Sequence, residues 1–165
     1  MFSIEKCPVP NNTLLDKYLS IPGAYVDCYT TGISKLMPFP EYIHAFCTTP
    51  LFKLERSILK FLVSKPSTDL QAKQAANGEI DKFAAWTVEA RSENELLMCD
   101  FLSRTRSWFM TENDGAKTKL YFGSAVVSKG GSESLGFGFR TLLGFHKIYS
   151  VLLLASAKSK LTQRI

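Results

Sequence analysis

The chain has 165 residues, of which 45% are hydrophobic, and this length predicts one domain, residues 1–165, with a core of its own. Its four cysteines lack C-x-x-C spacing, which argues against a disulfide framework or a zinc site. The net charge of +5 is uneven, because residues 115–165 hold eight Lys or Arg against one acid.

The N-terminal region is interrupted by Pro8, Pro10 and Pro22 and has no apolar leader. We therefore expect no signal peptide and a cytoplasmic protein, with at most a short helix over residues 12–19. A turn at Pro22-Gly23 precedes a stretch rich in β-forming residues, which predicts the first strand over residues 24–31.

Three helices are predicted next, over residues 41–47, 50–64 and 67–76. The second begins with a Thr cap and Pro50 at its first position, and Asn77-Gly78 closes the third. The periodicity of the second helix predicts that Leu51, Leu54, Ile58 and Leu62 face the core, while Lys53, Arg56 and Lys60 face solvent.

A meander of strands follows, over residues 82–91, 95–101, 104–112 and 117–127. Asn113-Asp114-Gly115 predicts a tight hairpin between the last two strands. A loop rich in Gly and Ser then leads into a long terminal helix over residues 136–165.

This terminal helix is apolar on more than one flank. Its uncharged stretch, residues 148–157, is ten residues long, which is too short for the roughly 20 residues of a membrane span. The helix must therefore pack on a sheet, a partner helix or a membrane surface. The order of elements predicts an α+β fold in which it covers one face of an antiparallel sheet.

The terminal helix also carries a resemblance. A run of Gly and Phe residues from Gly136 precedes Phe145-His146-Lys147. This segment resembles the C-terminal signature of a poorly characterised bacterial family grouped with the START and polyketide-cyclase (SRPBCC-type) helix-grip proteins. The resemblance implies a curved antiparallel sheet wrapped around the long terminal helix, with a cavity between them and two or three shorter helices before the meander. It implies no particular reaction.

Two sets of side chains alternate along the strand at 104–112. Arg104, Arg106, Trp108 and Met110 share one face, and Thr105, Ser107, Phe109 and Thr111 share the other. If the Arg-Trp face is concave, the arginines need a carboxylate, such as Asp100 or Glu89, or an anionic ligand. If it is convex, both arginines are solvated with Trp108 over them.

Two residues are candidates for acid–base chemistry. His146 lies mid-face on the terminal helix, where it either donates a proton in the cavity or hydrogen-bonds to the sheet. Asp27 lies between Tyr25 and Tyr29 on the first strand, as a pocket acid or as a solvated edge residue. No P-loop, G-x-S-x-G or H-E-x-x-H motif occurs, so we expect no cofactor and no metal.

We predict a binding protein that holds an apolar or amphipathic small molecule between the sheet and the terminal helix. The predicted ligand-binding residues are Trp86, Arg104, Arg106, Trp108, Tyr121, His146 and Tyr149. One alternative is a cyclase, isomerase or dehydratase that uses His146 or Asp27. Another is a homodimer or membrane-surface module formed through Ile148, Val151, Leu152 and Leu154. Nucleic-acid binding is disfavoured, because no reading helix or stacking motif accompanies the basic C-terminal region.

Overall fold

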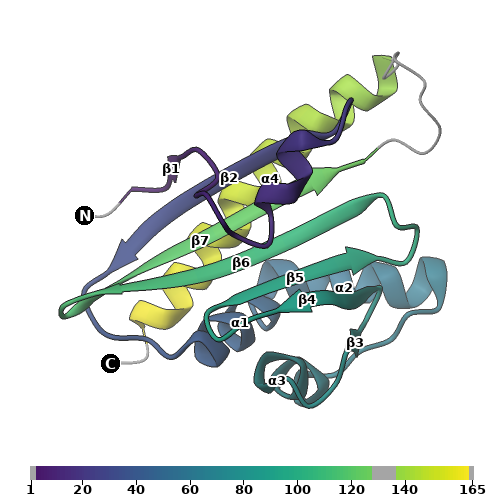
Figure 1. Cartoon of the computed structure of the whole chain (residues 1–165). Helices are drawn as coiled ribbons and strands as arrows, with labels where there is room; N and C mark the ends of the chain where they lie inside the picture. Colours follow the sequence, from purple (N-terminus) through teal and green to yellow (C-terminus); the bar gives the residue numbers. More distant parts are fainter. Residues whose placement is uncertain (1–2, 128–136, 164–165) are drawn as a thin grey trace.

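The computed structural model describes residues 3–127 and 137–163, and their side chains except at positions 59, 62, 63 and 137–146. This part of the chain folds into one antiparallel sheet and four α-helices, which confirms the predicted α+β class (Figure 1). The elements are β1 (Glu5–Lys6), the 3-10 helix η1 (Asp16–Ser20), β2 (Tyr25–Ile33), α1 (Phe39–Cys47), α2 (Pro50–Val63), α3 (Asp69–Asn77), β3 (Lys82–Phe83), β4 (Trp86–Arg91), β5 (Glu95–Asp100), β6 (Thr105–Asp114), β7 (Lys117–Val126) and α4 (Phe137–Thr162).

The seven strands follow the order β1-β2-β7-β6-β5-β4-β3. The first long strand, β2, therefore pairs along its whole length with the last strand, β7, and the meander continues outward from there. Helix α4 crosses one face of the sheet over β2 and β7, with α1 and α2 beside it (Figure 1). Within the described residues, no helix is both long and apolar enough to cross a membrane, as predicted.

Local sequence signals set the ends of the helices. The Thr49 hydroxyl accepts a hydrogen bond from the Phe52 amide at 3.2 Å, so α2 has the predicted cap before Pro50. Thr68 and Gln71 form a reciprocal capping box at the start of α3. Gly78 ends that helix in the left-handed conformation, with φ of 77°.

The predicted inward face of α2 was wrong in part: Leu51 packs against the core and Lys53 and Lys60 are exposed as predicted, and the side chain of Leu62 lies outside the described ones. Leu54 and Ile58 are about half exposed, whereas Arg56 is only 7% exposed. The helix instead turns Phe52 toward the core, where its ring lies 5.3 Å from that of Trp86. Arg56 bonds to the Cys47 and Ser67 carbonyl groups and to the Asp69 carboxylate, so its charge is satisfied inside the fold.

The predicted strand at 82–91 is two antiparallel strands, because the chain reverses at Ala84, which has a positive φ of 51°, so that Phe83 pairs with Trp86 across the turn. Strand β4 also contains a β-bulge. Val88 pairs with Met98 and Ala90 pairs with Leu97, so Glu89 is an extra residue without a partner in the ladder.

Both faces of the sheet are covered. The helices bury an aromatic core on one face, which includes Phe46, Phe109 and Phe122. The opposite face, here called the outer face, carries a second cluster that includes Trp108 and Leu97. It is covered by residues 7–20, here called the N-terminal segment, whose Leu15 is fully buried. The sequence did not predict this second layer.

Candidate functional site

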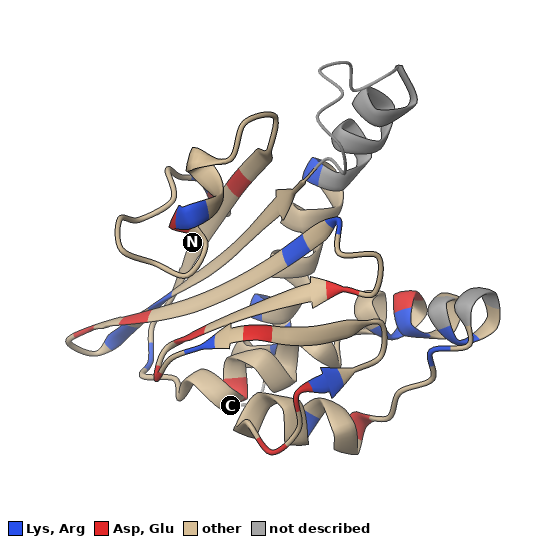
Figure 2. Ribbon diagram, turned by 45° about the vertical axis from the view of Figure 1, so that its right-hand side comes forward, with Lys and Arg blue, Asp and Glu red and all other residues tan. Residues whose placement is uncertain are grey.

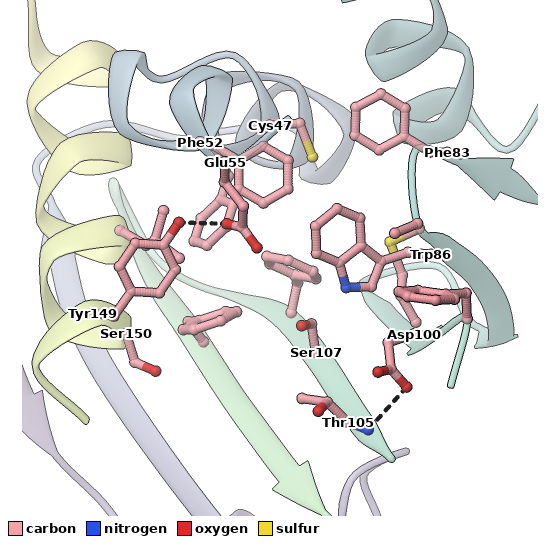
Figure 3. A pocket seen from close by; sticks show the side chains of 17 residues that line it. Cys47, Phe52, Glu55, Phe83, Trp86, Asp100, Thr105, Ser107, Tyr149 and Ser150 are labelled. Atoms are coloured by element: carbon pink, nitrogen blue, oxygen red, sulfur yellow. Dashed lines mark hydrogen bonds between the residues drawn. The ribbon is translucent and has the colours of Figure 1, made fainter. Parts of the chain in front are cut away.

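A pocket of about 340 Å³ opens between the sheet and the helices α1, α2 and α4 (Figure 3). It lies on the helix-covered face predicted to carry the cavity. Its lining consists of Phe46, Cys47, Phe52, Glu55, Phe83, Ala85, Trp86, Met98, Asp100, Phe101, Thr105, Ser107, Phe109, Phe122, Tyr149, Ser150 and Leu153.

The wall of the pocket is mainly aromatic. The ring of Phe46 lies edge-on to Phe109 at 4.8 Å and tilted against Phe122 at 4.9 Å. The Phe52 ring packs on Trp86 at 5.3 Å, so α1, α2 and three strands contribute to one network of rings. Such contacts hold aromatic side chains in fixed orientations, which makes this wall a preformed surface rather than a loose one.

A carboxylate and a phenol meet at one end of the pocket. The Tyr149 hydroxyl of α4 donates a hydrogen bond to the Glu55 carboxylate of α2 (Figure 3). Burial raises the pKa of Glu55, and the hydrogen bond from Tyr149 opposes that rise. Burial and the neighbouring Glu55 carboxylate both raise the pKa of Tyr149, so the phenol keeps its proton at neutral pH.

Asp100 lies at the other end, where β5 turns into β6. Its carboxylate accepts hydrogen bonds from the backbone amides of Arg104 at 2.7 Å and Thr105 at 3.0 Å. These bonds fix the turn and hold a negative charge at the edge of the pocket (Figure 3). Two of the seventeen lining residues are thus acids, and none of the seventeen is Lys, Arg or His.

The side of the pocket formed by strands β4 and β6 carries two polar groups, the Trp86 indole N–H and the Ser107 hydroxyl. Among the interactions of the described residues, neither the Trp86 indole N–H nor the Ser107 hydroxyl has a hydrogen-bond partner. Figure 3 shows both side chains reaching into the pocket. A donor and a hydroxyl on an otherwise apolar wall are groups that can orient a bound molecule.

The structure brings two of the sequence-predicted ligand residues, Trp86 and Tyr149, into this pocket. It places Arg104, Arg106, Trp108 and Tyr121 elsewhere, while the side chain of His146 lies outside the described ones. Arg104 is exposed in the β5–β6 turn. Arg106, on the outer face, pairs with Glu89 at 3.0 Å, which is one of the two carboxylate partners considered for it.

Trp108 and Tyr121 also lie on the outer face, and both are buried in the cluster under the N-terminal segment. The indole N–H of Trp108 donates to Glu95 at 2.8 Å. The face of β6 that meets the helices is therefore the one with Thr105, Ser107 and Phe109, and the Arg-Trp face is the one turned away from them.

Of the two candidates for acid–base chemistry, His146 and Asp27, the structure describes the side chain of Asp27 only. The side chain of His146 lies outside the described ones, although its backbone belongs to α4 one turn before Tyr149 and Ser150. Asp27 is 2% exposed, which excludes a solvated edge residue. Its carboxylate accepts hydrogen bonds from Ser124 at 2.5 Å and Tyr25 at 3.2 Å, and it does not line the pocket.

Glu55 was not predicted from the sequence. It lies one position before Arg56 on the helix whose inward face was misassigned, and its partner Tyr149 comes from α4, far away in the sequence. Ser107 and Phe109 were recognised only as one of two alternating faces. The helical position of Glu55, three residues after Phe52, is the one signal that links it to the buried side.

Within the described residues, no group of three or more His, Cys, Asp or Glu side chains could hold a metal ion. Figure 2 shows Lys and Arg interspersed with Asp and Glu over the described helices and strands rather than gathered on one surface. Comparison with known proteins adds no assignment: no family model, no curated protein and no solved structure matches this chain.

Proposed function

We propose that this protein binds a small apolar or amphipathic molecule in the pocket between the sheet and α4, as the members of a helix-grip family would. The observation that carries this proposal is a space of about 340 Å³ lined by eight aromatic side chains. That volume lies at the lower end of the range of about 300–1,000 Å³ found for small-molecule sites, which fits a ligand of one to three rings.

The charges of the lining narrow the class of ligand. Glu55 and Asp100 make the pocket acidic, and an anion would lose its hydration there without gaining a cationic partner from the lining residues. Aromatic faces also attract cations. We therefore propose an uncharged or cationic ligand, whose donor group reaches Glu55 and whose acceptor meets the Trp86 N–H or the Ser107 hydroxyl.

A matched pair of dyes tests this proposal. N-phenyl-1-naphthylamine is uncharged, and 8-anilinonaphthalene-1-sulfonate has the same ring system with a sulfonate. In a Trp108→Phe variant, Trp86 is the remaining tryptophan and reports on the pocket. We expect the neutral dye to quench Trp86 and to bind roughly tenfold or more tightly than the sulfonated dye, a difference of about 1.4 kcal/mol or more.

Two further variants locate the dye. Ser107→Phe places a ring inside the pocket and should abolish binding, whereas Thr87→Phe adds the same ring at an exposed position of β4 and should not. Thermal unfolding of both variants confirms that they are folded. Equal affinity for the two dyes would refute the proposed ligand class, and neutral-dye binding unchanged by Ser107→Phe would refute the pocket itself.

One observation favours acid–base catalysis as a second candidate. Glu55 and Tyr149 form a hydrogen-bonded pair inside the pocket, and burial raises the pKa of Glu55 toward the range useful to a general base. An isomerase or dehydratase would use this pair rather than Asp27. Native mass spectrometry of the purified protein would identify a retained ligand, and its conversion can then be followed. Tyr149→Phe should lower that rate by about 10²–10⁴-fold, while Tyr25→Phe should not.

A dimer or membrane-surface role through α4 remains a prediction, and fewer of the residues proposed for that surface are exposed than the sequence implied. Ile148 and Leu152 are 64% and 51% exposed, but Leu154 is fully buried in the core and cannot contribute to such a surface. Light scattering of the full chain tests the dimer, and Leu152→Glu should reduce its mass to that of a monomer.

A further inference from the structure

Two cysteines face each other where the N-terminal segment joins the sheet. The ladder between β1 and β2 pairs Glu5 with Thr30 and Lys6 with Tyr29, which brings Cys7 opposite Cys28. The Cys7 amide donates a hydrogen bond to the Cys28 carbonyl at 3.0 Å. Their sulfur atoms lie 3.3 Å apart, and both thiols are free in this structure.

This placement suits a covalent link. Directly opposite residues of an antiparallel pair have Cα atoms about 4.5–5.5 Å apart, which is within the range of about 4.4–6.8 Å that a disulfide spans. Because a disulfide bond is about 2.0 Å long, small rotations of the two side chains would close it without moving either strand.

The two thiols differ in their surroundings. Cys28 is 1% exposed and belongs to the cluster on the outer face. Cys7 is partly exposed at an open hollow, which Cys28 also lines from its buried position; the other lining residues are Lys6, Pro8, Val9, Leu19, Val26 and Asp27. The hydrogen bond between Cys7 and Cys28 and the charge of Lys119 lower the pKa of the Cys7 thiol, while burial opposes them. Cys7 is thus the accessible, more acidic partner, and Cys28 is the shielded one.

We propose that Cys7 and Cys28 are a redox site, which a peroxide converts reversibly into a disulfide across the two strands. The Cys7 thiolate attacks one peroxide oxygen, the O–O bond breaks, and Cys7 becomes a sulfenic acid as hydroxide leaves. The Cys28 sulfur then attacks the Cys7 sulfur, the S–O bond breaks and a second hydroxide leaves. The two thiol protons convert the hydroxides to water, so one hydrogen peroxide oxidises two thiols to one disulfide and two waters.

The disulfide would fasten the N-terminal segment to β2. It closes a loop that contains η1 and Leu15, the parts that cover the outer face of the sheet. Closing a loop of this length raises the unfolding midpoint by roughly 5–10 °C. This inference is independent of the ligand pocket, which lies on the opposite face.

The experiment treats the full chain with a small excess of hydrogen peroxide, followed by alkylation of the remaining thiols and peptide mapping. We expect a protein two hydrogen atoms lighter in which Cys7 is joined to Cys28, and dithiothreitol should reverse both the mass change and the rise in midpoint. Cys99 is partly exposed like Cys7 but has no neighbouring thiol, so it serves as an internal control. A disulfide joining other cysteines, or oxidation of Cys99 at the same rate as Cys7, would overturn the proposal.

A variant separates the two steps. Cys28→Ser replaces the second thiol by a hydroxyl of similar size, so Cys7 should stop at the sulfenic acid and react with dimedone. Cys99→Ser should leave the Cys7–Cys28 disulfide intact. No dimedone adduct at Cys7 in the Cys28→Ser protein would count against the proposed order of attack, and the mapping of the unmodified chain tests the pair even if this variant folds poorly.

Discussion

The close approach of the N-terminal segment to the sheet gives a prediction about Gly123. This glycine lies in the middle of β7, paired with Cys28 on one side and with Trp108 on the other. A Cβ atom at this position would lie 2.6 Å from Leu15 Cδ2, 2.9 Å from Trp108 Cε3 and 3.0 Å from the Asp27 carbonyl oxygen. Ordinary carbon contacts are about 3.5–4.0 Å, so Gly123→Ala overfills the site by up to about 1 Å.

Overpacking of this kind costs about 1–3 kcal/mol, and the lower backbone entropy of the unfolded variant returns about 0.4–1 kcal/mol. We expect a net loss of about 1–2 kcal/mol, which lowers the midpoint of thermal unfolding by about 2–8 °C. Leu15 is the flexible member of the three contacts, whereas the indole ring and the carbonyl group are held by the sheet.

A double-mutant cycle with Leu15→Ala isolates that contact. Truncating this buried side chain should itself cost about 2–5 kcal/mol, because it leaves a cavity under the N-terminal segment. The truncation also removes the nearest clash, so the two substitutions together should cost about 0.5–1.5 kcal/mol less than their sum. Urea unfolding followed by tryptophan fluorescence measures all four proteins. Strict additivity, or a Gly123→Ala variant as stable as the original, would refute the described seating of Leu15.

Two further predictions concern buried charges. The pKa of Glu55 is raised in the folded state, so there is a pH range in which the folded protein keeps this proton and the unfolded chain has released it. The stability that comes from this difference is present at low pH and is lost as the pH rises through the folded pKa. The unfolding midpoint of Glu55→Gln relative to the original should therefore increase from about pH 4 to pH 7, and a flat difference would contradict the burial of this carboxylate. Arg56→Ala removes a guanidinium from the Cys47 and Ser67 carbonyl groups and should cost about 2–4 kcal/mol in urea unfolding. Asp69→Asn should cost less than about 1 kcal/mol, because this carboxylate is half exposed; equal losses for the two variants would show that the ion pair, rather than the carbonyl bonds, stabilises the site.

Much of the fold followed from local signals in the sequence. The turn at Asn113-Asp114-Gly115, the cap before Pro50 and the closing Gly78 set the ends of strands and helices to within a few residues. Each of these signals acts through neighbouring residues alone, so it can be recognised without knowing the tertiary structure.

The residues that line the pocket could not be predicted from such local signals. Alternation along β6 separated Ser107 and Phe109 from Arg106 and Trp108, but both sets contain groups that can be buried. The side that meets α4 is decided by the pairing of β2 with β7 and by the seating of the N-terminal segment, which are contacts between distant parts of the chain. The N-terminal segment has no regular period, so its role as a cover was hidden.

Contacts between distant parts of the chain also explain why the inward face of α2 was misassigned. Its periodic leucines indicated an inward stripe, yet the helix presents Phe52, Glu55 and Arg56 to the fold. Ring contacts made by Phe52 and the carbonyl groups that receive Arg56 outweigh a stripe of aliphatic side chains, and both depend on tertiary partners.

The bulge in β4 has a consequence for how this fold can vary. Before the bulge, Trp86 lines the pocket and Val88 packs against the helix-covered core. Glu89, the extra residue in the ladder, holds Lys17 and Arg106 on the outer face, where Ala90 also packs. A single strand thus serves two layers through separate residues. Substitutions among the outer-face contacts of Glu89 can therefore accumulate in evolution without changing the shape of the pocket. Substitutions that change ligand preference in the pocket need not weaken the packing of the N-terminal segment.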